Sequence, residues 1–153
     1  MSRLSLLAAL LGCLLCACQP VDTTGLDEAM QGYLDSIHDL NPGLTLRYMP
    51  RTDKWHFISY RKGNSKIVSA PFFTYQETQT QFDRRGGLWT ALFSGTDDYH
   101  YTDRIAAHPT VRYWDHDPGD LTYRIPARDG VSYVTWRKEG DGWVISAIGD
   151  DAP

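Results

Sequence analysis

The sequence predicts an α+β fold, with an N-terminal helix followed by two related three-stranded antiparallel β-meanders in one small domain. Residues 26–40 have apolar side chains at helical spacing, residues 44–71 and 121–148 each contain three short segments rich in β-branched and aromatic residues, and these two blocks resemble each other. The chain has 153 residues, of which 42% are apolar, so it is long enough for one domain with a substantial core. We assign this domain to residues 25–150.

A helix is expected from Leu26 to Leu40. Thr24, followed by Asp27 three residues later, is typical of a helix start, and Asn41-Pro42-Gly43 is typical of a helix end. Apolar residues recur on one face of this segment: Leu26, Met30, Tyr33, Ile37 and Leu40. The opposite face carries several aspartates and no lysine or arginine, so we expect the apolar face to pack on the protein core rather than lie on a membrane.

Strands are expected in the two blocks. The first block contains LTLRYM, WHFISYRK and KIVSAPFF, and the second contains LTYRI, VSYVTWRK and WVISAI. Matched positions in 44–71 and 121–148 lie 76 or 77 residues apart, and both second strands end in Arg-Lys. The alignment predicts an internal duplication. The alternative is that any two meanders share alternation and turn residues.

The polar segment between the blocks contains histidines and aspartates, which are possible metal ligands. His100, His108 and His116 are spaced eight residues apart, which is neither the i, i+4 spacing of a helical zinc site nor the i, i+2 spacing of one strand face. The chain contains no nucleophile elbow, phosphate-binding loop or dinucleotide motif. We therefore expect no metal, no cofactor and no enzymatic activity.

The N-terminus has the pattern of an export signal. Arg3 precedes the apolar run Leu4–Leu15, which is shorter than the roughly 20 residues of a membrane span. Leu15-Cys16-Ala17-Cys18 then resembles the lipobox of bacterial lipoproteins. The resemblance implies a signal peptide at 1–17, lipidation of Cys18 as the new N-terminus, and a short lipid-anchored tether at 18–24.

Two other interpretations of the cysteines remain open. Leu10-Leu11-Gly12-Cys13 also fits the lipobox pattern, with a shorter apolar region before it. All three cysteines could instead be small apolar residues of an ordinary cleaved signal or of a core helix. If Cys18 is lipidated, the mature chain has no free thiol and no disulfide. Gln19 follows in place of the Asp that marks inner-membrane retention in enteric lipoproteins, so the resemblance favours the outer membrane, facing the periplasm.

Basic and aromatic residues suggest a binding surface. We expect that Arg61, Lys62, Arg137 and Lys138 cluster at equivalent strand ends, next to Tyr60 and Trp136, and bind an acidic protein or an anionic envelope glycan. The alternative is that these are solvated strand ends that discourage edge pairing. A nucleic-acid partner is not expected, because the net charge is −4 and the expected location is the cell envelope.

The functional hypothesis from the sequence is a small lipid-anchored cell-envelope protein that acts by binding. Its leading form is a structural or envelope-maintenance accessory, with the membrane as a partner through the N-terminal lipid. The second hypothesis is a periplasmic inhibitor or immunity lipoprotein that neutralises an enzyme or toxin. The third is a periplasmic enzyme.

Overall fold

The computed structural model describes residues 22–61, 66–93, 103–106, 120–127 and 130–150. The helical elements are α2 (Leu26–His38), α3 (Pro42–Thr45), the 3-10 turn η2 (Leu46–Tyr48), α4 (Tyr75–Asp83) and α5 (Gly87–Phe93). The strands are β1 (Trp55–Arg61), β2 (Lys66–Ser69), β3 (Phe72–Phe73), β4 (Asp103–Ala106), β5 (Leu121–Ala127), β6 (Gly130–Glu139) and β7 (Gly142–Asp150). The predicted α+β fold class is confirmed.

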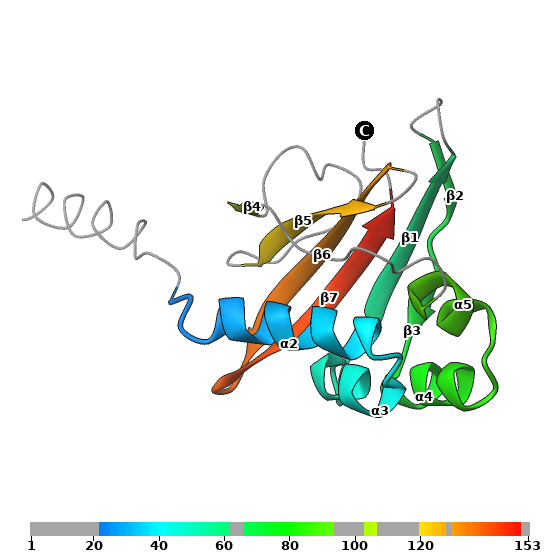
Figure 1. The fold of residues 1–153 in the computed structure, drawn as a ribbon, viewed down its shortest axis with the longest axis horizontal. Coiled ribbons are helices and arrows are strands. Elements are labelled where there is room, and N and C mark those ends of the chain that lie inside the picture. Colours follow the sequence, from blue (N-terminus) through cyan, green and yellow to red (C-terminus); the bar gives the residue numbers. More distant parts are fainter. Residues whose placement is uncertain (1–21, 62–65, 94–102, 107–119, 128–129, 151–153) are drawn as a thin grey trace, which may run out of the picture.

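The described strands form one mixed sheet. Their order is β2-β1-β7-β6-β5-β4, and β3 pairs with β1 outside this path. Strands β5, β6 and β7 are consecutive antiparallel neighbours, whereas β1 lies parallel to β7 with His56 opposite Ala147. The chain therefore enters the sheet beside its own last strand (Figure 1).

Helix α2 confirms the first predicted element, although its start differs from the expectation. The helix ends at His38, and Leu40 lies beyond it on the surface. The N-cap residue is Gly25 in the left-handed conformation, without a side-chain cap, so the predicted capping role of Thr24 and Asp27 is wrong. Because glycine adopts a positive φ at little cost, it can occupy this position without a capping side chain.

The prediction of two related meanders is wrong. Residues 44–48 are helical rather than extended, because Asn41 Oδ1 accepts a hydrogen bond from Leu44 N at 3.1 Å and Pro42 occupies the first helical position. Asn41-Pro42-Gly43 therefore begins a second helix as well as following the first. Residues 121–150 form a three-stranded antiparallel meander, but residues 44–48 are helical, so the proposed duplication of 44–71 and 121–148 is not confirmed.

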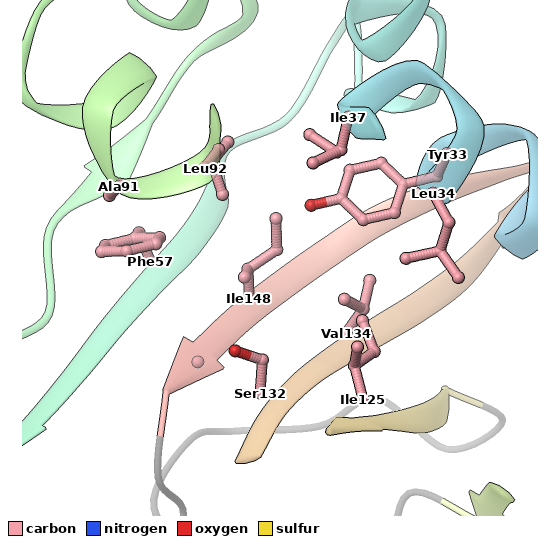
Figure 2. A pocket seen from close by; sticks show the side chains of 11 residues that line it. Tyr33, Leu34, Ile37, Phe57, Ala91, Leu92, Ile125, Ser132, Val134 and Ile148 are labelled. Carbon is pink, nitrogen blue, oxygen red and sulfur yellow. The ribbon is translucent and has the colours of Figure 1, made fainter. Parts of the chain in front are cut away.

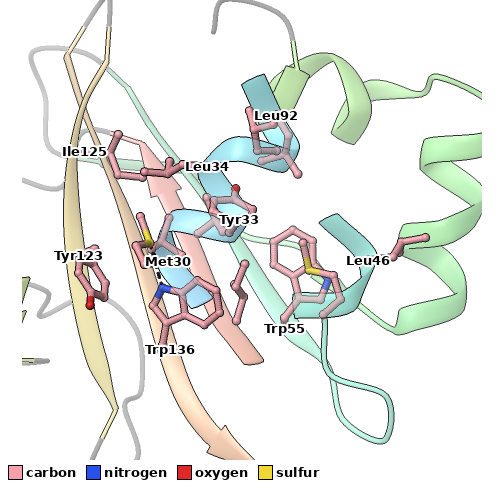
Figure 3. Packing of buried hydrophobic residues seen from close by; sticks show 14 of the residues in the cluster. Met30, Tyr33, Leu34, Leu46, Trp55, Leu92, Tyr123, Ile125 and Trp136 are labelled. Atoms are coloured by element: carbon pink, nitrogen blue, oxygen red, sulfur yellow. Dashed lines mark hydrogen bonds between the residues drawn. The ribbon is translucent and has the colours of Figure 1, made fainter. Parts of the chain in front are cut away.

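The core lies between α2 and the sheet face that this helix covers (Figures 1 and 3). The fully buried Trp136 indole donates from Nε1 to Met30 Sδ at 3.2 Å, and its ring makes edge-to-face contacts with Tyr33 and Tyr48. Gly32 makes this packing possible, because a Cβ there would lie 2.1 Å from the Tyr48 hydroxyl oxygen. The apolar face of α2 thus packs on the core, as predicted.

Helices α4 and α5 extend the core beside β1. The Thr74 and Glu77 side chains form a capping box at the start of α4, and hydrogen bonds from Thr74 hold the pKa of the Glu77 carboxyl below its usual value. Phe82 of α4 packs edge-to-face on Phe93 of α5 with ring centroids 5.3 Å apart. The buried Trp55 indole of β1 donates to Thr78 Oγ1 of α4 at 2.8 Å, which fixes the helix to the sheet.

The Trp55–Thr78 hydrogen bond yields a stability prediction. Thr78→Val should lower the free energy of unfolding by about 1–3 kcal/mol, because it leaves the buried Trp55 N–H without its partner. The control is Thr80→Val, a half-buried position on the same helix whose hydroxyl donates to the Gln76 carbonyl oxygen. Urea unfolding of both variants, with Trp55→Phe as the second arm of a double-mutant cycle, measures the effect. Equal losses in the two threonine variants would contradict the prediction.

Candidate functional site

A cavity of about 220 Å³ lies between α2, α5 and the covered face of the sheet (Figure 2). Each of these elements contributes to its wall, and most of the lining is apolar. The lining residues are Tyr33, Leu34, Ile37, Phe57, Ala91, Leu92, Ile125, Ser132, Val134, Ile148 and Gly149.

Local sequence explains why a space remains here. Tyr33, Leu34 and Ile37 lie on one face of α2 because of helical spacing, and the alternation of β6 directs Ser132 and Val134 to the same side of the sheet. Where neighbouring positions carry large side chains, Ala91 and Ser132 are small. Both short side chains line the cavity, and Ala91 is exposed.

Two hydroxyl groups are the polar side-chain atoms of this lining. In Figure 2 the Tyr33 phenol extends from α2 into the cavity, and the Ser132 hydroxyl lies on the opposite wall. The lining contains no carboxylate, imidazole, lysine or arginine. This arrangement can bury an apolar molecule and hydrogen-bond to it, but it provides no pair of groups for acid and base catalysis.

The volume limits the size of an occupant. An apolar cavity of about 150 Å³ holds benzene, and pockets for drug-sized ligands begin at about 300 Å³. The cavity here, at about 220 Å³, lies between these values. It therefore suits a small ring system or a short branched chain.

The structure does not bring the sequence-predicted binding residues together. Arg137 Nη2 lies 3.2 Å from Asp53 Oδ2, just before β1 begins, whereas Arg61 ends β1. Arg61 lies six steps along β1 from Trp55, which is about 20 Å at about 3.3 Å per residue. Because β1 is parallel to β7 and β6 is antiparallel to it, the two arginines lie at opposite ends of the sheet. A single basic cluster joining Arg61 to Arg137 and Lys138 is therefore wrong.

The other predicted residues differ in position. Trp136 is fully buried beside Met30 and offers no surface, and Lys138 is paired with Asp22. Tyr60 lies in β1, while Lys62, Cys18 and the three spaced histidines lie outside the described residues. The cavity residues were missed as a site because each of them, taken alone, has the pattern of a core residue. Ser132, a hydroxyl at an inward position of a strand, was the available signal.

Neither a metal-ion site nor a membrane-spanning helix is found in the described part of the chain. In residues 22–61, 66–93, 103–106, 120–127 and 130–150, no three His, Cys, Asp or Glu side chains are placed to hold a metal ion together. Within those same ranges, no helix has the length and apolar composition needed to cross a bilayer.

Comparison with known proteins identifies similar folds. No protein-family model matches the sequence, and no curated protein matches it. A Pectobacterium atrosepticum protein of unknown function from the DUF3225 family shares 15% identity over 86% of this chain and 90% of its own, with a TM-score of 0.50.

Two further solved structures are similar. An NTF-2 like protein of unknown function from Shewanella oneidensis shares 11% identity over 83% of this chain and 96% of its own, with a TM-score of 0.48. A DUF4783 family protein from Bacteroides fragilis shares 9% identity over 80% and 96%, with a TM-score of 0.49. At these identities the likeness concerns the fold alone.

The cavity yields a binding prediction. Ala91→Phe should weaken the binding of 1-naphthol, a small ring system with one hydroxyl, by roughly tenfold or more, which corresponds to about 1.4 kcal/mol. The new ring would occupy the edge of the cavity, where Ala91 is exposed and the backbone need not move. Thr90→Phe adds the same ring at the next, exposed position of α5 without lining the cavity. Titration calorimetry that finds equal affinity for both variants would contradict the prediction.

Proposed function

We propose that the protein is a lipid-anchored binding protein of the bacterial cell envelope, whose cavity holds a small, mostly apolar molecule with one hydrogen-bonding group. The observation that carries this proposal is the apolar cavity with two hydroxyls in its wall. A buried apolar surface supplies affinity, at about 25 cal/mol per Å² removed from water, and a few polar groups fix orientation.

Binding rather than catalysis is supported by the chemistry of the lining. A general acid and a general base need titratable groups within hydrogen-bond reach of the reacting atoms. The Tyr33 phenol is the one titratable side chain in the wall of this cavity. We therefore assign the protein the role of an envelope-maintenance accessory that holds its ligand unchanged.

The anchoring part of the proposal comes from the sequence. Leu15-Cys16-Ala17-Cys18 supplies the lipobox-like motif, and Gln19 favours the outer membrane, facing the periplasm. Asp22 follows Cys18 by four residues, so the folded body stays close to the membrane surface. The ligand must therefore come to the membrane, because the protein has too short a tether to reach across the periplasm.

The anchor is tested by labelling. Cys18→Ser should abolish the incorporation of radiolabelled fatty acid and leave an uncleaved or soluble product. Cys13→Ser is the matched control and should be labelled normally. Labelling that persists in Cys18→Ser and disappears in Cys13→Ser would move the modified residue to the earlier motif.

The bound ligand is tested by extraction. Wild-type protein purified from envelopes, extracted with organic solvent and analysed by mass spectrometry, should yield a small apolar compound enriched over the extract of Ala91→Phe protein. Thr90→Phe should retain the compound at the wild-type level. The same extract from wild-type and Ala91→Phe protein would overturn the cavity as the binding site.

A further inference from the structure

The chain just before α2 is fixed to the end of the β6–β7 hairpin. Lys138 Nζ donates a hydrogen bond to Asp22 Oδ2, and the Trp143 indole donates from Nε1 to the Thr24 carbonyl oxygen at 2.9 Å. Thr24 N donates in turn to Asp22 Oδ1 at 3.0 Å, and the Lys138 ammonium lies 5.8 Å from the centre of the Trp143 ring. We call Asp22, Thr24, Lys138 and Trp143 the anchor clamp.

The clamp combines one exposed and one buried contact. The Asp22 and Lys138 side chains are 62% and 34% exposed, so their ion pair alone contributes little to stability. The Trp143 side chain is buried, and loss of its hydrogen bond would leave a shielded N–H without a partner. Hydrogen bonds from Lys138 and then from Thr24 hold the pKa of the Asp22 carboxyl well below its usual value, so Asp22 stays charged across the physiological pH range.

Because the segment between Cys18 and Asp22 is short, the clamp restricts how the folded domain can be oriented relative to a lipid on Cys18. At ~3.5 Å per residue, the four residues from Cys18 to Asp22 span at most about 14 Å. Without the clamp, the first buried residue of the described chain, which starts at residue 22, is Leu26; it follows Cys18 by eight residues, and the reach would be about 28 Å. The clamp therefore halves the distance over which the folded body could move from a lipid on Cys18.

We propose that the turn end of the β6–β7 hairpin is the membrane-facing surface of this protein, with the phospholipid bilayer that carries the Cys18 lipid as its partner. This inference rests on the proposed lipidation of Cys18. Glu139 at the end of β6 and the turn residues Gly140 and Asp141 are all exposed and lie beside the clamp. The far end of the sheet, where Ser69 pairs with Ser59, lies about eight strand residues away, or about 25 Å.

The charges at the hairpin end do not favour electrostatic binding to lipid headgroups. Beside the hairpin end, the four basic side chains are balanced by four acidic ones: Arg51, Lys54, Arg137 and Lys138 against Asp22, Asp53, Glu139 and Asp141. Arg137 and Lys138 are paired with Asp53 and Asp22. A surface of this composition has no excess positive charge to attract anionic headgroups. The orientation should therefore come from the short anchored chain and should not depend on the anionic lipid content.

Fluorescence quenching tests the orientation in the full-length lipoprotein. With Cys18 acylated at sulfur, the mature chain has no other thiol, so Asp141→Cys and Ser69→Cys each provide one labelling position. Both proteins are reconstituted into vesicles that contain headgroup-nitroxide lipid, with and without anionic lipid. The Asp141 label should be quenched several-fold more strongly than the Ser69 label in both kinds of vesicle.

Two variants test whether the clamp and the short tether cause the difference in quenching. Lys138→Gln with Trp143→Phe removes both side-chain donors of the clamp and should abolish most of the difference between the labels. An insertion of eight Gly/Ser residues between Cys18 and Asp22 leaves the clamp and the core intact and should have the same effect, so the test does not depend on the stability of the first variant.

The outcomes separate this inference from the proposed function. Equal quenching of the two labels in a protein shown to carry fatty acid would overturn the orientation and leave the anchor standing. A difference in quenching that depends strongly on anionic lipid would indicate that the protein adsorbs electrostatically instead of being oriented by its short tether. That result would also overturn the proposed orientation. A protein without fatty acid on Cys18 would overturn the anchoring proposal, and the orientation with it.

Discussion

The parallel pairing of β1 with β7 is the constraint on which the rest of the structure depends. It places His56 beside Ala147 and Ile58 beside Gly149. Strand β1, which comes early in the sequence, is thereby joined to the sheet formed by β5, β6 and β7. Parallel neighbours cannot be joined by a tight turn, and here the chain between β1 and β7 includes α4 and α5. The pairing thus determines that α5 lies beside α2 and that a cavity can form where these two helices meet the sheet.

Packing of α2 on the sheet gives this arrangement its stability and limits the cavity to one half of the sheet. Around Trp136 the helix contributes Met30 and Tyr33, and these rings and the thioether fill the space (Figure 3). Each such side chain contributes about 1.5–3 kcal/mol when it is fully buried. Farther along the sheet, Ser132 of β6 and Ala91 of α5 have small side chains, and a cavity remains beside them. The same helix therefore closes the core at one end and forms a wall of the cavity at the other.

Periodicity predicted some elements of this fold and could not predict others. Helix α2 and the meander of β5–β7 were recognisable because their apolar spacing is local and complete. Residues 44–49 were misassigned because Asn41-Pro42-Gly43 is compatible with both the end of one helix and the start of another, and the Asn41 cap is visible only in three dimensions. Strand direction is likewise absent from a local pattern, so Arg61 and Arg137 were expected to meet although the sheet separates them. The cavity depends on which side chains from elements far apart in sequence line the same space, and no single segment reveals it.

The anchor clamp and the cavity lie toward opposite ends of the sheet, and the length of the strands determines the distance between them. At one end, Trp143 and Lys138 hold the chain that follows Cys18. The cavity lies toward the other end, where Phe57 pairs with Ile148, six residues along β7 from Gly142 and so about 20 Å away. A lipid on Cys18 would therefore hold the hairpin turn near the bilayer while the cavity stays beyond the headgroups, in contact with the aqueous side. A ligand would then have to arrive through water or on a carrier, which favours a small molecule of limited apolar surface over a membrane lipid and agrees with the size of the cavity.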